Sequence, residues 1–341
     1  MIYLVCSVLT TPCAKRGSGM QKIIPTKRNP QAPSGVIMIR PHHFYANPQT
    51  EGDNAFQRLA SEPMKTADLT GGVNLSKQAY EQVTNAAKIL TAHGIQVHIF
   101  EDETQDKPDS VFPNNWFSTH SGGHIAIYPM FAENRRKERR SDIIDMLKQK
   151  YRVQDVLDYS GLEHDGLYLE GTGAMVLDHI ERVAYAVQSN RTNPLALERF
   201  CSHFNYEPML FDAADENGTA VYHTNVLMCI GTDFVMLGSD MVSDETRRNE
   251  IITRFEASGR EVITLTPEQI AEFCGNALEL QSAQQRLLAL SQRAYDALTS
   301  AQRDRLEKSV ALVPLDVSAI ETAGGSIRCM LAGIHLAARS I

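Results

Sequence analysis

A cysteine, a histidine and a glutamate stand far apart in the chain, each beside an apolar segment or a glycine-rich turn. Cys329 follows a Gly-Gly-Ser stretch, His223 comes just before an apolar run, and Glu170 leads into a Gly-Thr-Gly turn. A thiol nucleophile needs a base, the base needs an acid that orients it, and only the fold brings such groups together. A single cysteine in an apolar run is usually inert core. The three residues together therefore predict nucleophilic catalysis where each one alone does not.

Several amides accompany these residues. Asn114 and Asn115 stand side by side next to the only tryptophan, Trp116, and Asn225 comes two residues after His223. Adjacent asparagines by themselves favour a turn in which the side chain bonds to the backbone. Their position at the end of an apolar segment is also typical of polar groups that point into a cleft. Both interpretations stay open from the residues alone.

Composition and charge restrict the class of protein. The chain has 341 residues, is 43% hydrophobic and 22% charged, and carries a formal net charge of -8. These values are typical of a globular protein, and the acidic balance argues against a nucleic acid as the main partner. The sequence has no Walker A, G-x-G-x-x-G after a strand, or G-x-S-x-G motif. Nucleotide binding and serine hydrolysis therefore lack their usual signatures.

The six cysteines are scattered over the chain and form no C-x-x-C pair. Their spacing fits neither a zinc site nor a disulfide framework, so we expect no metal and a reducing, cytoplasmic setting. The apolar start Ile2–Leu9 is short, and basic residues follow it, which is the wrong order for a secretory signal. We expect residues 1–35 to be a loose leader or a mis-assigned start. No apolar run is long enough to predict a membrane span.

Short strands and helices alternate from residue 36 onward. The first unit is a strand at Val36–Ile39, a helix at Ser76–His93 and a strand at Ile95–Phe100. Later segments repeat this alternation and add hairpins, such as the one expected from Val226–Ile230 and Phe234–Leu237. Strands connected by both hairpins and helical crossovers predict an α/β protein.

The stretch Thr266–Asp304 differs, because its spacing predicts a long helical region, broken into two helices near Cys274. No linker rich in proline, glycine or serine divides the chain. We therefore expect a single domain over residues 36–341. The sequence shows no repeat clear enough to give the number of strand–helix units.

Four motifs, in this order, resemble the guanidino-group-modifying enzymes of the pentein superfamily. They are Phe112–Trp116, Leu169–Gly173, His223–Asn225 and Gly324–Cys329. Within the superfamily, the chain looks most like the bacterial amidinotransferase-like hydrolases of citrulline use, and the resemblance spans about residues 36–335. It implies a five-bladed α/β propeller of pseudo-symmetric ββαβ modules with a central active site. It also implies covalent catalysis without a metal or an organic cofactor.

The resemblance assigns a role to each member of the set of three. Cys329 matches the nucleophile and His223 the general acid and base, and Glu170 matches the residue that holds the planar head group of the substrate. Arg191 stands in a turn that resembles the Ser-x-Arg-Thr of the family and is a candidate to bind the substrate α-carboxylate, which a guanidinium fork fits. Arg136 is a second candidate.

Arg135, beside Arg136, is a weaker candidate for the same carboxylate. The basic run Arg135–Arg140 could equally be the solvated start of a helix. We therefore expect Arg191, before Arg136 and Arg135, to bind the substrate α-carboxylate.

The chain departs from the deiminases at two positions. Asn115 and Asn225 stand where those enzymes usually carry carboxylates. A guanidinium is a cation that favours buried carboxylates, whereas a ureido group is neutral and offers a carbonyl to which an Asn N–H can donate. With Glu170 as the remaining carboxylate, the site suits a ureido substrate better. The expected reaction is hydrolysis of citrulline to ornithine, carbon dioxide and ammonia, with Asn114 as a further substrate-binding residue.

Three alternatives remain. Arginine or a methylated arginine as substrate would make the protein an arginine deiminase or a dimethylarginine dimethylaminohydrolase. An amidinotransferase would differ mainly in whether an amine or water resolves the covalent intermediate. A non-catalytic pentein would serve as a binding module, although an ordered Cys–His–Glu set argues against it. We expect a small amino acid as the partner, no nucleic acid and no membrane, and we leave assembly into a homo-oligomer open.

Overall fold

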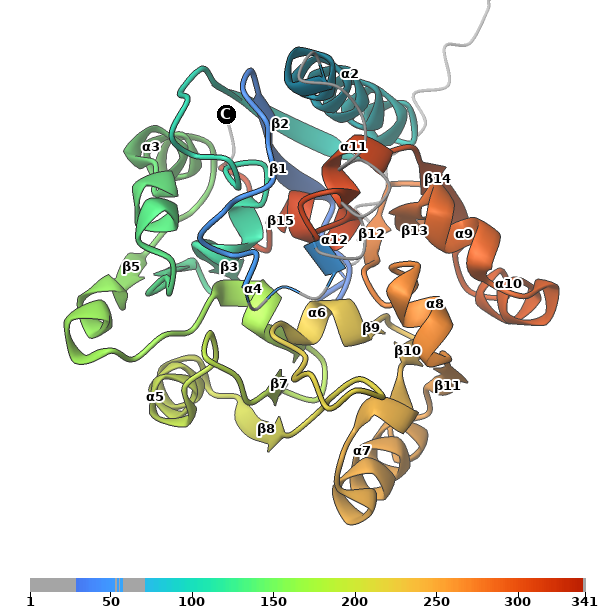
Figure 1. Cartoon of the computed structure of the whole chain (residues 1–341). Coiled ribbons are helices and arrows are strands. Elements are labelled where there is room, and N and C mark those ends of the chain that lie inside the picture. The colour runs from blue at the N-terminus through green and yellow to red at the C-terminus, as the bar shows by residue number, and fades with distance from the viewer. Residues whose placement is uncertain (1–28, 53, 55, 58–70, 340–341) are drawn as a thin grey trace, which may run out of the picture.

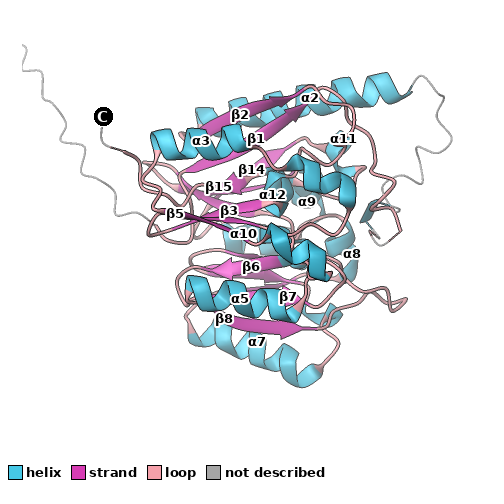
Figure 2. Ribbon diagram, turned by 90° about the vertical axis from the view of Figure 1, so that its left-hand side faces the viewer, coloured by secondary structure: helices cyan, strands magenta, loops and turns pink. Residues whose placement is uncertain are grey.

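Five small β-sheets form a ring in the computed structural model of the chain (Figure 1). The structure describes residues 29–52, 54, 56, 57 and 71–339, except for the side chains of residues 71–73. Most of the predicted leader, residues 1–28, lies outside the described residues. A side view shows the strands running roughly along the axis of the ring (Figure 2). Among the described helices, none combines the length and the apolar character needed to cross a membrane.

Every sheet repeats one order, in which an antiparallel strand pair is followed by a crossover to a parallel third strand. Four sheets are continuous in sequence: β3 (Phe117–His120), β4 (His124–Ile127) and β5 (Asp155–Asp158); β6 (Met175–Asp178), β7 (Val183–Val187) and β8 (Glu207–Phe211); β9 (Met228–Ile230), β10 (Phe234–Leu237) and β11 (Glu261–Thr264); β12 (Leu278–Gln281), β13 (Arg286–Ser291) and β14 (Ala311–Leu315). In the fifth sheet, β15 (Ala332–Gly333) joins β1 (Gly35–Pro41) and β2 (Gln96–Asp102) from the other end of the chain. The predicted five-bladed propeller of ββαβ modules is confirmed.

The crossover helices lie on the outside of the ring (Figure 1). They are α2 (Gly71–Ala92), α3 (Ser141–Lys150), α5 (Pro194–Phe204), α7 (Glu245–Ala257), α9 (Gln292–Ala297) and α10 (Ser300–Leu306). The connections between modules contain α8 (Pro267–Ala271), α11 (Ser318–Glu321) and the 3-10 turn η3 (Ser160–Asp165). The 3-10 turns η2 (Glu133–Glu138) and η4 (Ser239–Met241) lie in the same crossovers as α3 and α7. In α2, Ala79, Val83 and Leu90 are buried at helical spacing, so one stripe of the helix packs against the sheet.

The predicted long helical region at Thr266–Asp304 is wrong. After α8 the chain forms the hairpin β12–β13, and only then do α9 and α10 follow. Residues Leu287–Leu290 are fully buried in the central strand of their sheet. Leu, Ala and Gln favour a helix locally, but the differences in helix propensity are at most about 0.7 kcal/mol per ordinary residue. Burial of both faces of β13 outweighs them, because strand preference is decided mostly by packing.

A short turn precedes the innermost strand of each sheet, and these turns gather near the centre of the ring (Figure 1). The turns are η1 (Pro113–Asn115), α4 (Gly171–Ala174), α6 (Thr224–Leu227), the turn Phe273–Asn276 and α12 (Ile327–Met330). Two or three residues before the strand, each turn carries a corresponding residue: Asn115, Gly173, Asn225, Asn276 and Cys329. The ring therefore brings five widely separated positions of the chain into one place.

Candidate active site

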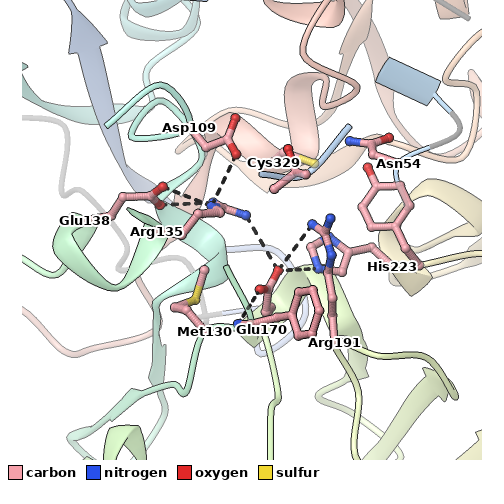
Figure 3. Close-up of polar contacts among 12 residues, drawn as sticks. Asn54, Asp109, Met130, Arg135, Glu138, Glu170, Arg191, His223 and Cys329 are labelled. Atoms are coloured by element: carbon pink, nitrogen blue, oxygen red, sulfur yellow. Dashed lines mark hydrogen bonds and ion pairs between the residues drawn. The ribbon is translucent and has the colours of Figure 1, made fainter. Parts of the chain in front are cut away.

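The inner turns surround a narrow cavity at the centre of the ring. The cavity is lined by Thr50, Asn54, Asp109, Phe112, Asn115, Arg135, Arg191, Tyr222, His223, Ala323, Gly325 and Cys329. The space that a water-sized sphere can occupy has a volume of about 20 Å³, which is roughly the room that one water molecule needs. A thiol, an imidazole, a carboxylate and two guanidiniums therefore face the same small space (Figure 3).

Cys329 is buried in α12, and two amides approach its sulfur. The Nδ2 atoms of Asn225 and Asn276 donate to Sγ at 3.2 and 3.3 Å. The turn begins at Ser326, whose carbonyl accepts from the Cys329 N–H at 3.0 Å. A Cβ on Gly325 would lie 2.7 Å from the ring of Phe112, so the approach to Cys329 has room only for glycine.

The other described cysteines are core residues. Cys201, Cys229 and Cys274 are buried away from the cavity lining. Burial raises the pKa of each of these thiols to about 12, which keeps them protonated and unreactive at neutral pH. Only Cys329, among the described cysteines, faces the cavity.

His223 and Glu170 form a buried pair. Oε2 of Glu170 lies 2.9 Å from Nε2 of His223, and both side chains are buried. An ionised carboxylate only accepts hydrogen bonds, so Nε2 donates and Nδ1 remains as the basic nitrogen of a neutral imidazole. Burial lowers the pKa of His223, although Glu170 opposes the shift. The imidazole is thus neutral and held in the tautomer that a general base requires.

Glu170 lies behind His223 and is not part of the cavity lining. Its Oε1 accepts from the N–H of Phe131 at 2.9 Å, and its Oε2 lies 3.6 Å from guanidinium nitrogens of Arg135 and Arg191 (Figure 3). Burial alone would raise the pKa of this carboxyl, but Arg191, His223 and Arg135 together lower it well below its usual range. Glu170 is therefore an ionised orienting group for His223, where the resemblance implied a direct contact with the substrate.

Asp109 is a second carboxylate in the site, and no motif of the sequence points to it. It lines the cavity, its Oδ2 accepts from Asn47 Nδ2 at 2.7 Å, and Arg135 Nε lies 3.5 Å from Oδ2. Its Oδ1 has no hydrogen-bond partner among the described residues. Burial raises the pKa of Asp109. The expectation that Glu170 is the only carboxylate of the site is thus corrected.

Of the two arginines expected to bind the substrate, Arg191 lines the cavity and Arg136 does not. Arg191 lines the cavity, with its guanidinium carbon 4.8 Å from the centre of the Tyr222 ring. Arg136 lies outside the lining and donates to the backbone carbonyls of Met130 and Phe131 at 3.1 and 3.3 Å. Its neighbour Arg135 lines the cavity instead, because successive side chains of a 3-10 turn point about a third of a turn apart.

Arg135 is held by acids within the protein. Its Nε and a terminal nitrogen donate to the two carboxylate oxygens of Glu138 at 2.9 and 3.0 Å. Burial raises the pKa of Glu138 to about 7 despite this pair. Arg135 is thus paired with Glu138, Asp109 and Glu170 in the wall of the cavity. Arg191 is the other guanidinium of the lining.

The predicted amides divide into three placements. Asn115 lines the cavity, and its buried Nδ2 has no hydrogen-bond partner among the described residues. Asn225 contacts the sulfur of Cys329. Asn114 is fully buried but is not part of the lining. Asn276, which was not predicted from the sequence, occupies the place in its module that Asn115 and Asn225 occupy in theirs.

The ring thus brings Cys329, His223, Asn115 and Arg191 to one cavity and sets Glu170 and Asn225 directly behind it. No group of three or more His, Cys, Asp or Glu side chains in the described part of the chain is arranged to hold a metal ion. Comparison of the five inner turns with one another points to Asn276, but only once the structure has given the modules. Asp109 carries no such signal, since it stands three residues before Phe112 in a loop.

Comparisons with known proteins agree with this architecture. The model of a family described as "N,N dimethylarginine dimethylhydrolase, eukaryotic" matches residues 40–336. No curated protein matches the chain significantly in sequence. Among solved structures, the substrate-bound N-terminal domain of ArgZ, an arginine dihydrolase from the ornithine–ammonia cycle in cyanobacteria, has a TM-score of 0.66 at 14% identity and covers 88% of this chain and 97% of its own.

Two further structures share the fold. AgrE in complex with ornithine and NAD+ has a TM-score of 0.67 at 17% identity, over 90% of this chain and 40% of that chain. A dimethylarginine dimethylaminohydrolase adduct with S-methyl-L-thiocitrulline has a TM-score of 0.55 at 14% identity, over 88% of this chain and 99% of that chain. Since the family model spans most of the chain and the ring of five sheets agrees with it, the protein belongs to the N,N dimethylarginine dimethylhydrolase family of the pentein superfamily and is a hydrolase of carbon–nitrogen bonds outside peptides.

Proposed function

We propose that this protein hydrolyses the ureido group of citrulline through a covalent intermediate on Cys329. The thiolate of Cys329 attacks the ureido carbon, His223 protonates the departing alkyl nitrogen, and ornithine leaves. A carbamoyl group remains on the sulfur. His223 then takes a proton from a water molecule that attacks this group, the thiolate leaves, and carbamate breaks down to carbon dioxide and ammonia. One water is consumed in each cycle.

The observation that carries the proposal is the amide of Asn115. Its Nδ2 is buried at the cavity and has no hydrogen-bond partner among the described residues. A buried donor without an acceptor is costly, by about 1–3 kcal/mol. The carbonyl oxygen of a ureido group supplies that acceptor, whereas a guanidinium has only donors. Asn115 thus favours a substrate with a carbonyl at its head group.

Two charged side chains support an amino acid as the rest of the substrate. Arg191 offers a guanidinium for an α-carboxylate, and Asp109 Oδ1 is a carboxylate oxygen with no partner among the described residues. An α-ammonium would pair with Asp109 as the α-carboxylate pairs with Arg191. Opposite charges at two points of the lining match a zwitterion.

Arginine is the second candidate substrate. Asp109 places a carboxylate in the cavity beyond those that the sequence suggested, and a guanidinium would pair with it. ArgZ, which shares the fold, is an arginine dihydrolase. With arginine, release of ammonia would give citrulline first, and a second hydrolysis at the same thiol would give ornithine.

The deciding experiment is incubation of the purified protein with citrulline and with arginine in separate reactions, followed by identification of the amino-acid products. We expect citrulline to give ornithine and ammonia at the higher kcat/KM. Cys329→Ser is the control and should abolish turnover without loss of fold, because an alcohol is a far weaker nucleophile than a thiolate at neutral pH. Preferential conversion of arginine to citrulline would make the protein a deiminase and contradict the proposal.

A further inference from the structure

Two asparagines from different modules meet at one sulfur atom. Asn225 lies in α6 and Asn276 in the turn before β12, and both side chains are buried. Their Nδ2 atoms lie 3.2 and 3.3 Å from Cys329 Sγ, within range of an N–H···S hydrogen bond. Sulfur in a neutral thiol is a weak acceptor, whereas a thiolate is a full negative charge. Two donors aimed at one sulfur therefore favour the ionised form.

The rest of the Asn276 side chain fixes which of its atoms faces the sulfur. Oδ1 accepts from the backbone N–H of Arg328 at 3.0 Å, and Nδ2 also donates to the backbone carbonyl of Asn225 at 3.0 Å. A flipped amide would set its oxygen against the Asn225 carbonyl and its NH2 group against the Arg328 N–H. That arrangement would lose both bonds, so the donor orientation is the one that the surroundings impose.

The same contacts tie Asn276 to the element that carries the nucleophile. Arg328 directly precedes Cys329 in α12, and its N–H also lies 3.3 Å from the backbone oxygen of Asn276. Asn276 thus holds both the start of α12 and the sulfur that α12 presents. Asn225, whose carbonyl is bonded to Asn276, completes a linked pair.

We propose that Asn276 is a catalytic residue that, with Asn225, holds Cys329 as a thiolate for attack. The inference rests on the proposed role of Cys329 as the nucleophile. On ionisation the thiol proton passes to His223, which is neutral until then and lines the same cavity, and Glu170 stabilises the imidazolium that forms. The two amides act again in the second half of the reaction, when the sulfur is the leaving group and regains its negative charge.

The test is alkylation of Cys329 by iodoacetamide across pH 5–10 without substrate, with the labelled cysteine identified by mass spectrometry. Asn276→Asp keeps the acceptor for the Arg328 N–H but replaces the donor to the sulfur with a negatively charged oxygen. We expect the midpoint of the alkylation profile to move up by at least about one pH unit, the size of one lost charge-assisted hydrogen bond. We also expect kcat for the preferred substrate to fall at least about tenfold with little change in KM.

The matched control is Asn193→Asp, the same change on the outer helix α5, where aspartate caps a helix as well as asparagine does. This variant should keep the wild-type alkylation midpoint. An unchanged midpoint in folded Asn276→Asp would overturn the inference, as would a wild-type Cys329 that is alkylated only at the pH typical of core thiols. The second measurement needs no variant and holds if Asn276→Asp fails to fold. Because alkylation needs no substrate, failure of the citrulline proposal would leave this result intact.

Discussion

The charge state of the site is set by a few buried residues. Glu170 is ionised because Arg191, His223 and Arg135 oppose the effect of burial on its pKa. His223 is neutral because burial outweighs the attraction of Glu170. An ionised acid beside a neutral imidazole helps the imidazole to accept a proton and stabilises the imidazolium that forms. The charge states of Glu170 and His223 are therefore set by burial and by the buried charged groups around them.

His223→Ala should lower kcat by roughly 10²–10⁴-fold, the range usual for loss of a general acid–base. His223 lines the cavity, and no other described histidine does. The measurement is the steady-state rate with the preferred substrate. His164→Ala, the same change on an exposed turn, is the control and should retain the wild-type rate. A comparable loss in the control, or none in His223→Ala, would remove His223 from the mechanism.

Asn115→Asp should shift the preference of the enzyme from citrulline toward arginine. The substitution replaces an N–H donor at the cavity with a carboxylate, which pairs with a guanidinium and repels a carbonyl oxygen. The measurement is kcat/KM for both amino acids on wild type and variant, and we expect the ratio to change by at least about tenfold, as for one charge-assisted hydrogen bond. A constant ratio would mean that Asn115 does not contact the head group.

At the scale of elements, the inner turns occupy corresponding positions in the five modules. Each one ends a connection and starts an inner strand, so it lies near the axis of the ring (Figure 1). Hydroxyl bonds lock neighbouring turns together: Thr224 Oγ1 donates to the Ala174 carbonyl at 2.6 Å and accepts from the Val187 N–H at 2.7 Å. The positions of the side chains at the site therefore depend on close contact between turns of adjacent modules.

Gly173→Ala tests that contact. A Cβ at Gly173 would lie 2.2 Å from Asn115 Nδ2 and 2.9 Å from His223 Nδ1, so one added methyl group must displace both side chains. We expect kcat to fall at least about 100-fold, because small displacements of reacting groups are costly, and the free energy of unfolding to fall by about 1–3 kcal/mol. Gly161→Ala, where nothing lies within 4 Å of the new Cβ, should leave both quantities near their wild-type values. Full activity in Gly173→Ala would contradict the placement of the two side chains.

At the scale of the whole molecule, adjacent modules bury polar groups between them. His120 on β3 packs against Phe204 of the neighbouring α5, with ring centres 4.2 Å apart. Its Nε2 lies 2.6 Å from Ser118 Oγ, which in turn lies 2.6 Å from the hydroxyl of Tyr128. Burial lowers the pKa of His120 well below its usual value. The closed ring thus keeps a neutral imidazole at a junction between modules.

The burial of His120 makes the free energy of unfolding decrease as the pH falls. The unfolded chain binds a proton at His120 below about pH 6.5, and the folded chain does not, so the contribution of His120 is complete above pH 6.5 and is lost as the pH falls. Between pH 7.5 and 5.5 the loss is about 1.4 kcal/mol. His120→Gln removes this titration. Urea unfolding of both proteins at the two pH values should show wild type losing about that much more stability on acidification than the variant does. Equal losses would show that His120 is protonated in the folded protein.

The sequence by itself determined most of the strand–helix order and the residue types of the candidate site. Apolar runs such as Val36–Ile39 and the stripe of α2 follow from local spacing, which folding preserves. The glycine-rich approach to Cys329 and the placement of His223 before an apolar run could likewise be read locally. The resemblance to penteins added the five modules, which the chain itself does not reveal as repeats.

The tertiary structure decided which segments are buried as strands and which side chains point into the cavity. The segment Thr266–Asp304 favours a helix locally, yet the ring needs the hairpin β12–β13, whose burial outweighs local preference. The side-chain direction in η2 puts Arg135, and not Arg136, into the cavity. Asp109 enters the site from a loop without a local signal. Packing of one module against the next fixes these outcomes. The free-energy changes on burying a charge or a strand face are larger than the differences in local helix or strand propensity, and they arise only once the ring has closed.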